Sequence, residues 1–141
     1  MLFDTHCHLD DPRLHGELDD VLSRAKQAGV RRITTIGCAE DVASLQSALR
    51  IAHAHRDWIS ATVGVHPHDA KNLDDTLHDA IVEAGRDDSV VAIGETGLDF
   101  HYDHSPREVQ LDAFRKQVAI AKELKKPLVI HTRSAPAETL Q

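Results

Sequence analysis

The chain has 141 residues, 41% of them apolar, and a formal net charge of −7, which suits one domain with a hydrophobic core. We expect no membrane span, no signal peptide and a cytoplasmic location, because the apolar runs are short, the start is polar and two cysteines cannot build a disulfide framework. The acidic balance argues against a protein that coats nucleic acid, since such binding requires many Lys and Arg contacts with phosphates.

Five short apolar segments predict β-strands, and apolar residues at helical spacing predict a helix between each pair of them. In chain order the strands are 2–3, 33–36, 59–63, 90–93 and 128–130, and the helices are 18–28, 42–52, 73–84 and 111–121. The strand segments are continuously apolar, which is typical of strands buried on both faces of a parallel sheet.

The last of these helices has the clearest predicted start. Ser105 is expected as its N-cap, Pro106 as its first helical residue and Glu108 as the partner in a capping box. Pro127 ends the helical pattern before the fifth strand.

The alternating order of strands and helices predicts an α/β fold with a parallel sheet. A doubly wound sheet and a (β/α)8 barrel both fit this order. A complete barrel requires about 250 residues, and residues 134–138 resemble the start of another helix. If the fold is a barrel, we expect the chain to be truncated after about five strands.

Histidine and carboxylate side chains follow four of the five predicted strands, in a chain with 11 histidines. The stretches are 4–8, 64–68, 94–99 and 131–133. Active sites of parallel α/β folds collect at the C-terminal ends of the strands, so we expect these side chains to meet.

His6, His8, Glu95 and His131 are the predicted metal ligands. Residues two apart on an extended chain project to the same side, so His6 and His8 can reach one cation. Such a pair alone could be an ordinary polar strand end, but Glu95 and His131 at equivalent positions favour a metal site. A carboxylate between two histidine groups can bridge two ions about 4 Å apart. Imidazole nitrogens suit Zn, Mn, Fe, Co or Ni, and carboxylates extend the range toward Mg.

Other candidate residues carry weaker predictions. His66 is expected to contact substrate or a metal-bound water, with a structural role as the alternative, and His68 is expected to point away from the site. Arg133 could contact a substrate phosphate or pair with Asp99. Cys7 is expected to be a small buried residue and not a nucleophile. The sequence contains no Gly-rich phosphate loop or Ser nucleophile elbow, which leaves a metal-activated water as the nucleophile.

Four stretches together resemble the TatD family of metal-dependent deoxyribonucleases, and their order and spacing agree with that family. They are DTHCHLD at 4–10, GVHPH at 64–68, IGETGLD at 93–99 and PLVIHTR at 127–133. The family belongs to the metal-dependent hydrolases with TIM-barrel folds. The resemblance implies a (β/α)8 barrel, with residues 1–141 as the N-terminal part of a single hydrolase domain.

The resemblance also implies a site with two divalent ions, Mg, Mn or Zn. His6 and His8 would hold the first ion, Glu95 would bridge both and His131 would hold the second, while a further His and Asp of the family pattern would lie beyond Gln141. The implied activity is exonuclease-type hydrolysis of DNA, at single strands or ends, by a two-metal-activated water. We expect Glu95 and His66 to be the catalytic residues.

Two other functions remain open. One is an amidohydrolase that cleaves a C–N or ester bond on the same barrel; many such enzymes carry a carboxylated Lys after strand four, so Glu95 there favours a nuclease. The other is a catalytically incomplete fragment. We expect the 141-residue chain alone to be inactive on DNA, and either self-associated through open sheet edges or part of a larger barrel.

Overall fold

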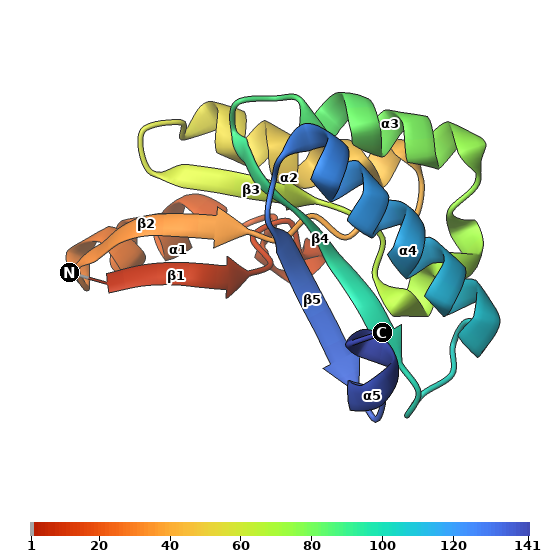
Figure 1. Ribbon diagram of the computed structural model, residues 1–141. Helices are drawn as coiled ribbons and strands as arrows, with labels where there is room; N and C mark the ends of the chain where they lie inside the picture. The colour runs from red at the N-terminus through yellow and green to blue at the C-terminus, as the bar shows by residue number, and fades with distance from the viewer. Residues whose placement is uncertain (1) are drawn as a thin grey trace.

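The computed structural model describes residues 2–141, and its central feature is a five-stranded parallel sheet with the order β1-β2-β3-β4-β5 (Figure 1). The strands are β1 (Leu2–Cys7), β2 (Val30–Thr35), β3 (Ile59–Val63), β4 (Val90–Asp99) and β5 (Leu128–Arg133). Strands that follow one another in this way form the wall of a (β/α)8 barrel, whereas a doubly wound sheet reverses its order at a switch point. The predicted barrel-type fold is confirmed over its first five strands.

Five α-helices and two short 3-10 helices connect and follow these strands. They are η1 (Pro12–Leu14), α1 (Leu18–Gln27), α2 (Val42–Ala54), η2 (Pro67–Asn72), α3 (Asp75–Gly85), α4 (Arg107–Leu124) and α5 (Pro136–Thr139). Figure 1 shows α2, α3 and α4 covering one face of the curled sheet. No helix within residues 2–141 is long and apolar enough to cross a membrane.

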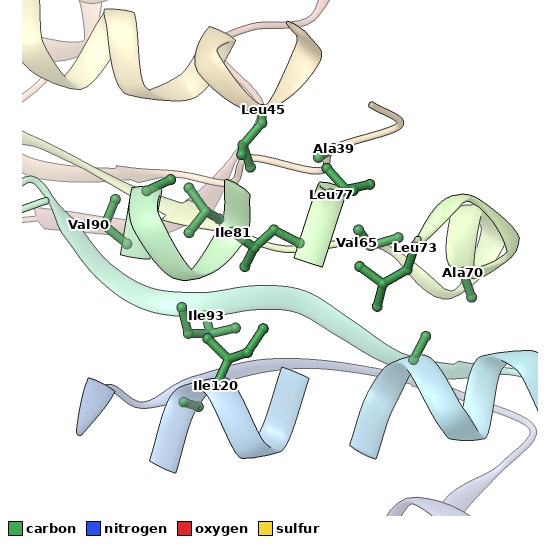
Figure 2. Packing of buried hydrophobic residues seen from close by; sticks show 14 of the residues in the cluster. Ala39, Leu45, Val65, Ala70, Leu73, Leu77, Ile81, Val90, Ile93 and Ile120 are labelled. Carbon is green, nitrogen blue, oxygen red and sulfur yellow. The ribbon is translucent and has the colours of Figure 1, made fainter. Parts of the chain in front are cut away.

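The largest core cluster lies between these helices and the sheet. Leu45 of α2, Ile81 of α3 and Ile120 of α4 pack with Ile93 of β4, and all four are almost fully buried (Figure 2). Burying each side chain of this size contributes about 1.5–3 kcal/mol. The apolar helix faces thereby fix the position of β4, and the C-terminal ends of the strands are left for polar residues.

The prediction that the strands are buried on both faces is correct for β3 and wrong for β1. Leu2 is 57% exposed and Phe3 is 58% exposed, and Ile130 of β5 is 46% exposed. The reason is their position, because β1 and β5 are the edge strands of the sheet within residues 2–141.

Strands β4 and β5 run beyond their apolar segments because backbone pairing continues past them. Gly97 lies opposite His131, and Asp99 lies opposite Arg133. Glu95 in the middle of β4 and His131 in the second half of β5 therefore lie within strands and not in the loops that follow.

The predicted cap of α4 is wrong. The helix begins at Arg107 with Pro106 at the N-cap position, and no side chain caps it. The buried Ser105 hydroxyl is used elsewhere: it donates to the carbonyl oxygen of His68 at 2.7 Å and accepts the N–H of Lys71 at 3.2 Å. A long-range contact with η2 has replaced the local capping bond.

Candidate metal centre

The four predicted ligands lie together: His6 and His8 come from the end of β1, Glu95 from the middle of β4 and His131 from the second half of β5. The two carboxylate oxygens of Glu95 face different histidines: Oε2 is 3.4 Å from His6 Nε2, and Oε1 is 3.3 Å from His131 Nδ1. Glu95 is only 8% exposed, whereas the side chain of His6 is 45% exposed. The site therefore has a buried carboxylate at its centre and an open side toward solvent.

Two triplets of side chains have the geometry of a cation site, and Glu95 belongs to both. One is His6, His8 and Glu95, the other is His66, Glu95 and His131, and within each triplet the ligand atoms lie within 4.8 Å of one another. Two imidazole nitrogens and one carboxylate suit Zn or Mn, and they leave coordination positions free for water or substrate. The first triplet thus offers three ligand atoms to one ion, and Glu95 and His131 of the second offer two to another, with His66 beside them.

Gly97 allows β4 to approach β5 closely beside the site. A Cβ atom at Gly97 would collide with the carbonyl oxygen of His131, and the φ of Gly97, +137°, is one that side-chain-bearing residues rarely adopt. Only glycine fits a position that has both constraints. The backbone pairing of Gly97 with His131 in turn sets where the His131 ring lies relative to Glu95.

Asp99, at the end of β4, orients the histidines of the second triplet. It is fully buried, and its Oδ2 accepts hydrogen bonds from His68 Nε2 at 2.8 Å and His131 Nε2 at 3.1 Å. Burial raises the pKa of Asp99, but hydrogen bonds from the Tyr102 N–H, His68 and the His101 N–H outweigh burial and hold that pKa well below its usual range.

The ionised Asp99 determines which nitrogen of His131 is free. A carboxylate only accepts, so His131 donates its Nε2–H to Asp99, and the neutral form of the ring then has its lone pair on Nδ1. Nδ1 is the atom that faces Glu95. A carboxylate that fixes the tautomer and orientation of a histidine in this way is the usual support of a metal-ligating imidazole.

His66 differs from His131 in the nitrogen that is occupied. Its Nδ1 accepts the N–H of His68 at 3.2 Å, so the neutral ring carries its proton on Nε2, which lies 3.2 Å from His131 Nδ1. Burial, and then the neighbouring His131, lower the pKa of His66 to about 3, which keeps the ring neutral. In this state His66 offers the site an N–H donor and not a lone pair.

One prediction about a neighbouring residue is wrong, and one of the two alternatives for Arg133 is excluded. His68 does not point away: η2 begins at Pro67 and turns the His68 ring toward Asp99. Arg133 does not pair with Asp99, whose oxygens are occupied by other donors, and its guanidinium carbon lies 4.7 Å from the ring centre of Tyr102.

Sequence reasoning also missed Gln110 and Gln117, two buried residues of α4 that hold the backbone beside the site. Gln117 accepts the Val65 N–H at 2.8 Å and donates to the Val65 carbonyl at 3.1 Å, and Gln110 makes the same pair of bonds with Asp99 at 2.8 and 3.1 Å. Each side-chain amide makes the two backbone hydrogen bonds that a neighbouring strand would make, at a place where β-pairing has ended. The available signal was two glutamines seven residues apart, which lie on one face of a helix, among apolar residues.

The cysteines do not supply a nucleophile. Burial, together with nearby Asp4, raises the pKa of Cys7 to about 12, and burial, together with Glu95, raises that of Cys38 to about 12. Both are therefore thiols at neutral pH, and the reactive form of cysteine is the thiolate.

The fold and site together define a barrel-type α/β protein with a histidine–carboxylate centre, and comparison with known proteins gives the family. The family described as TatD related DNase matches residues 3–141. The chain is 39% identical over 140 residues to YabD of Bacillus subtilis (strain 168), named an uncharacterized metal-dependent hydrolase, covering 99% of this chain and 54% of that protein. The chain belongs to the TatD-related DNase family.

Two further similarities agree with this membership. A protein of Pectobacterium carotovorum subsp. carotovorum (strain PC1), named 3′-5′ ssDNA/RNA exonuclease TatD, is 40% identical over 134 residues, which cover 95% of this chain and 51% of that protein. The crystal structure of YJJV, a TatD homolog from Escherichia coli K12, superposes with a TM-score of 0.87 at 30% identity, covering 98% of this chain and 53% of that chain. The chain spans about half the length of the relatives that it matches.

Proposed function

We propose that residues 1–141 are the N-terminal part of a single barrel domain that hydrolyses phosphodiester bonds of single-stranded DNA or of DNA ends with the help of divalent ions. The observation that carries this proposal is the position of Glu95 between two histidine groups. Two ions held by a shared carboxylate are typical of enzymes that act on phosphodiesters. The exonuclease name of a relative that is 40% identical supports the same class of substrate.

In this proposal each residue has a separate role. His6 and His8 would hold one divalent ion with Glu95, and His131 would hold the second with the other oxygen of Glu95. Bound Mg, Mn or Zn would lower the pKa of a bound water and stabilise the negative charge that develops on the phosphate. Asp99 keeps the Nδ1 lone pair of His131 directed at Glu95.

His66 is the proposed donor to the substrate. Its Nδ1 is occupied by the His68 N–H, so its Nε2–H can donate to a phosphate oxygen that enters beside His131. A single positioned donor or proton-transfer group contributes about 10²–10⁴-fold to a rate, whereas Glu95 positions both ions. Loss of Glu95 should therefore lower activity more than loss of His66.

The test uses the protein encoded by the natural reading frame that contains residues 1–141. It compares the hydrolysis of different substrates by the wild type and by variants. We expect Mn²⁺-dependent hydrolysis of single-stranded oligonucleotides and no turnover of small amides or carboxylic esters. Glu95→Ala should abolish this hydrolysis and His66→Ala should reduce it. Turnover of amides without hydrolysis of oligonucleotides would instead support an amidohydrolase, and a Glu95→Ala variant near wild-type activity would contradict the shared-carboxylate site.

A further inference from the structure

The loop between β4 and α4 presents an exposed aromatic ring beside the candidate metal centre. Tyr102 is 50% exposed, and its ring stacks on the exposed His104 with 5.5 Å between ring centres and 15° between ring planes. It also contacts the edge of His68 at 5.7 Å. His68 and His131 share a hydrogen-bonding oxygen of Asp99, so the ring lies next to the second triplet.

This loop is held in place by hydrogen bonds and does not depend on a ligand to order it. Asp99 Oδ1 accepts the N–H groups of His101 at 3.0 Å and Tyr102 at 3.1 Å, and Lys71 Nζ donates to the carbonyl of His104 at 3.2 Å. A surface that is already ordered binds without the entropic cost of immobilising its side chains and backbone. The same buried carboxylate thus fixes both the histidines of the centre and the position of Tyr102.

A positive charge accompanies the ring. The Arg133 guanidinium carbon lies 4.7 Å from the Tyr102 ring centre, and no carboxylate of residues 2–141 forms an ion pair with Arg133. Asp103, the acidic residue of the same loop, pairs with Arg107 at 3.0 Å. In a chain with a formal net charge of −7, a cation without a carboxylate partner beside the site is available to an anionic ligand.

We propose that Tyr102, His104 and Arg133 form a nucleotide-binding subsite, in which Arg133 leaves the Tyr102 ring to contact a phosphate and the neighbouring base of single-stranded nucleic acid stacks on the ring in its place. This inference rests on the proposed function and adds to it a residue-level reason for preferring single strands. Bases of a duplex are stacked on each other, whereas an unpaired base can stack on an aromatic side chain. Stacking tolerates any base, so the subsite does not select sequence.

The experiment measures fluorescence anisotropy of a labelled short oligothymidylate and of the same oligonucleotide with abasic residues, using the protein encoded by the natural reading frame that contains residues 1–141, in EDTA to prevent hydrolysis. Loss of the stacking contact between one base and an aromatic side chain lowers affinity by about tenfold or more. We therefore expect Tyr102→Ala to weaken binding of oligothymidylate by this factor. Binding of the abasic oligonucleotide should not change. Tyr102→Phe, which keeps the ring and removes only the hydroxyl, should bind like the wild type.

Arg133→Gln tests the phosphate contact. It should weaken binding of both oligonucleotides and reduce the dependence of log affinity on log salt by about 0.7, the value for one phosphate contact in single strands. Arg56→Gln is the matched control, because Arg56 is exposed and precedes β3 at the opposite end of the sheet. It makes the same change in net charge and should leave the salt dependence near that of the wild type.

Several results would overturn the subsite. These are wild-type binding of oligothymidylate by Tyr102→Ala, an equal loss for the abasic oligonucleotide, or no binding of either oligonucleotide by the wild type. Metal-dependent hydrolysis of bis(p-nitrophenyl) phosphate by the encoded natural protein tests the proposed function separately. Hydrolysis with unaltered DNA binding in Tyr102→Ala would overturn the subsite alone, and absence of hydrolysis in the wild type would overturn the proposed function.

Discussion

Asp99 connects more parts of the site than any of the candidate ligands. One oxygen accepts from two histidines, and the other accepts from two backbone N–H groups of the loop that carries Tyr102. A buried carboxylate that makes four hydrogen bonds stays ionised, and its charge decides the tautomers of the rings bonded to it. At the scale of single residues, the centre therefore depends on a group that would not itself contact an ion.

Asp99→Asn tests this dependence with a change that preserves size. The amide can also donate, so the Nε2–H tautomer of His131 is no longer enforced, and loss of such a supporting carboxylate typically lowers metal affinity about 10–100-fold. Isothermal titration with Zn²⁺ measures the affinity. Asp87→Asn, which alters a hydrogen-bonded carboxylate outside the centre, is the control and should leave the Zn²⁺ affinity unchanged. Unaltered Zn²⁺ affinity in Asp99→Asn would contradict the role of Asp99 in orienting His131.

Asp87 gives a prediction about pH and stability. The hydroxyl and the N–H of Ser89, at 2.6 and 2.8 Å, hold the pKa of Asp87 well below its usual range, with a further contribution from His53. A depressed carboxyl pKa stabilises the fold above the unfolded-state pKa near about 3.9, and this stabilisation is lost as the pH falls through the folded-state pKa.

We therefore expect Asp87→Asn to reduce the free energy of unfolding near neutral pH by about 1 kcal/mol, a value kept small because the carboxylate is partly exposed and screened by solvent. The difference from the wild type should shrink as the pH is lowered below about 4. Urea unfolding at a series of pH values checks this. A difference that stays constant or grows toward acid pH would show that the charge of Asp87 is not what stabilises the fold.

At the scale of elements, α4 both packs on the sheet and positions the site. Its apolar residues Ala113, Ile120 and Ala121 belong to the main core, while Gln110 and Gln117 bond to the backbone of Asp99 and Val65. Val65 directly precedes His66, so one helix places a backbone segment at the end of β3 and another at the end of β4.

Gln117→Leu should be strongly destabilising although it replaces a polar residue with an apolar one of similar size. It would leave the N–H and carbonyl of Val65 buried without their partner, and each unsatisfied group costs about 1–3 kcal/mol. We expect a loss of about 2–4 kcal/mol in urea unfolding. Gln46→Leu, on an exposed position of α2, is the matched control and should change stability little. A Gln117→Leu variant as stable as that control would contradict the proposed role of the Gln117–Val65 hydrogen bonds.

The local pattern predicted the elements well because apolar periodicity reports on burial, and burial determines which segments become strands and helices. It failed where a side chain had a choice of distant partners. Ser105 binds η2 instead of capping α4, and His68 turns inward to Asp99. The convergence of His6 and Glu95 was predictable from parallel strands, whereas the roles of Asp99 and Gln117 depend on contacts that no sequence spacing specifies.

At the scale of the whole molecule, the sheet has two open edges within residues 2–141. Both edge strands, β1 and β5, expose apolar side chains, among them Leu2, Phe3 and Ile130. Exposed strand edges with apolar residues are sites of association. We expect the 141-residue chain to self-associate, with a sedimentation coefficient that rises with protein concentration. A monomer over the whole range accessible to analytical ultracentrifugation would contradict this prediction.

The central claim is that Glu95 is shared by two cation sites, and anomalous diffraction from Mn²⁺-soaked crystals tests it most directly. We predict two anomalous peaks about 4 Å apart, one beside His6 and His8 and the other beside His131, with a Glu95 oxygen next to each. In crystals of a His6→Ala, His8→Ala double variant, the first peak should disappear. Peaks away from Glu95, or both peaks unchanged in the double variant, would contradict the claim.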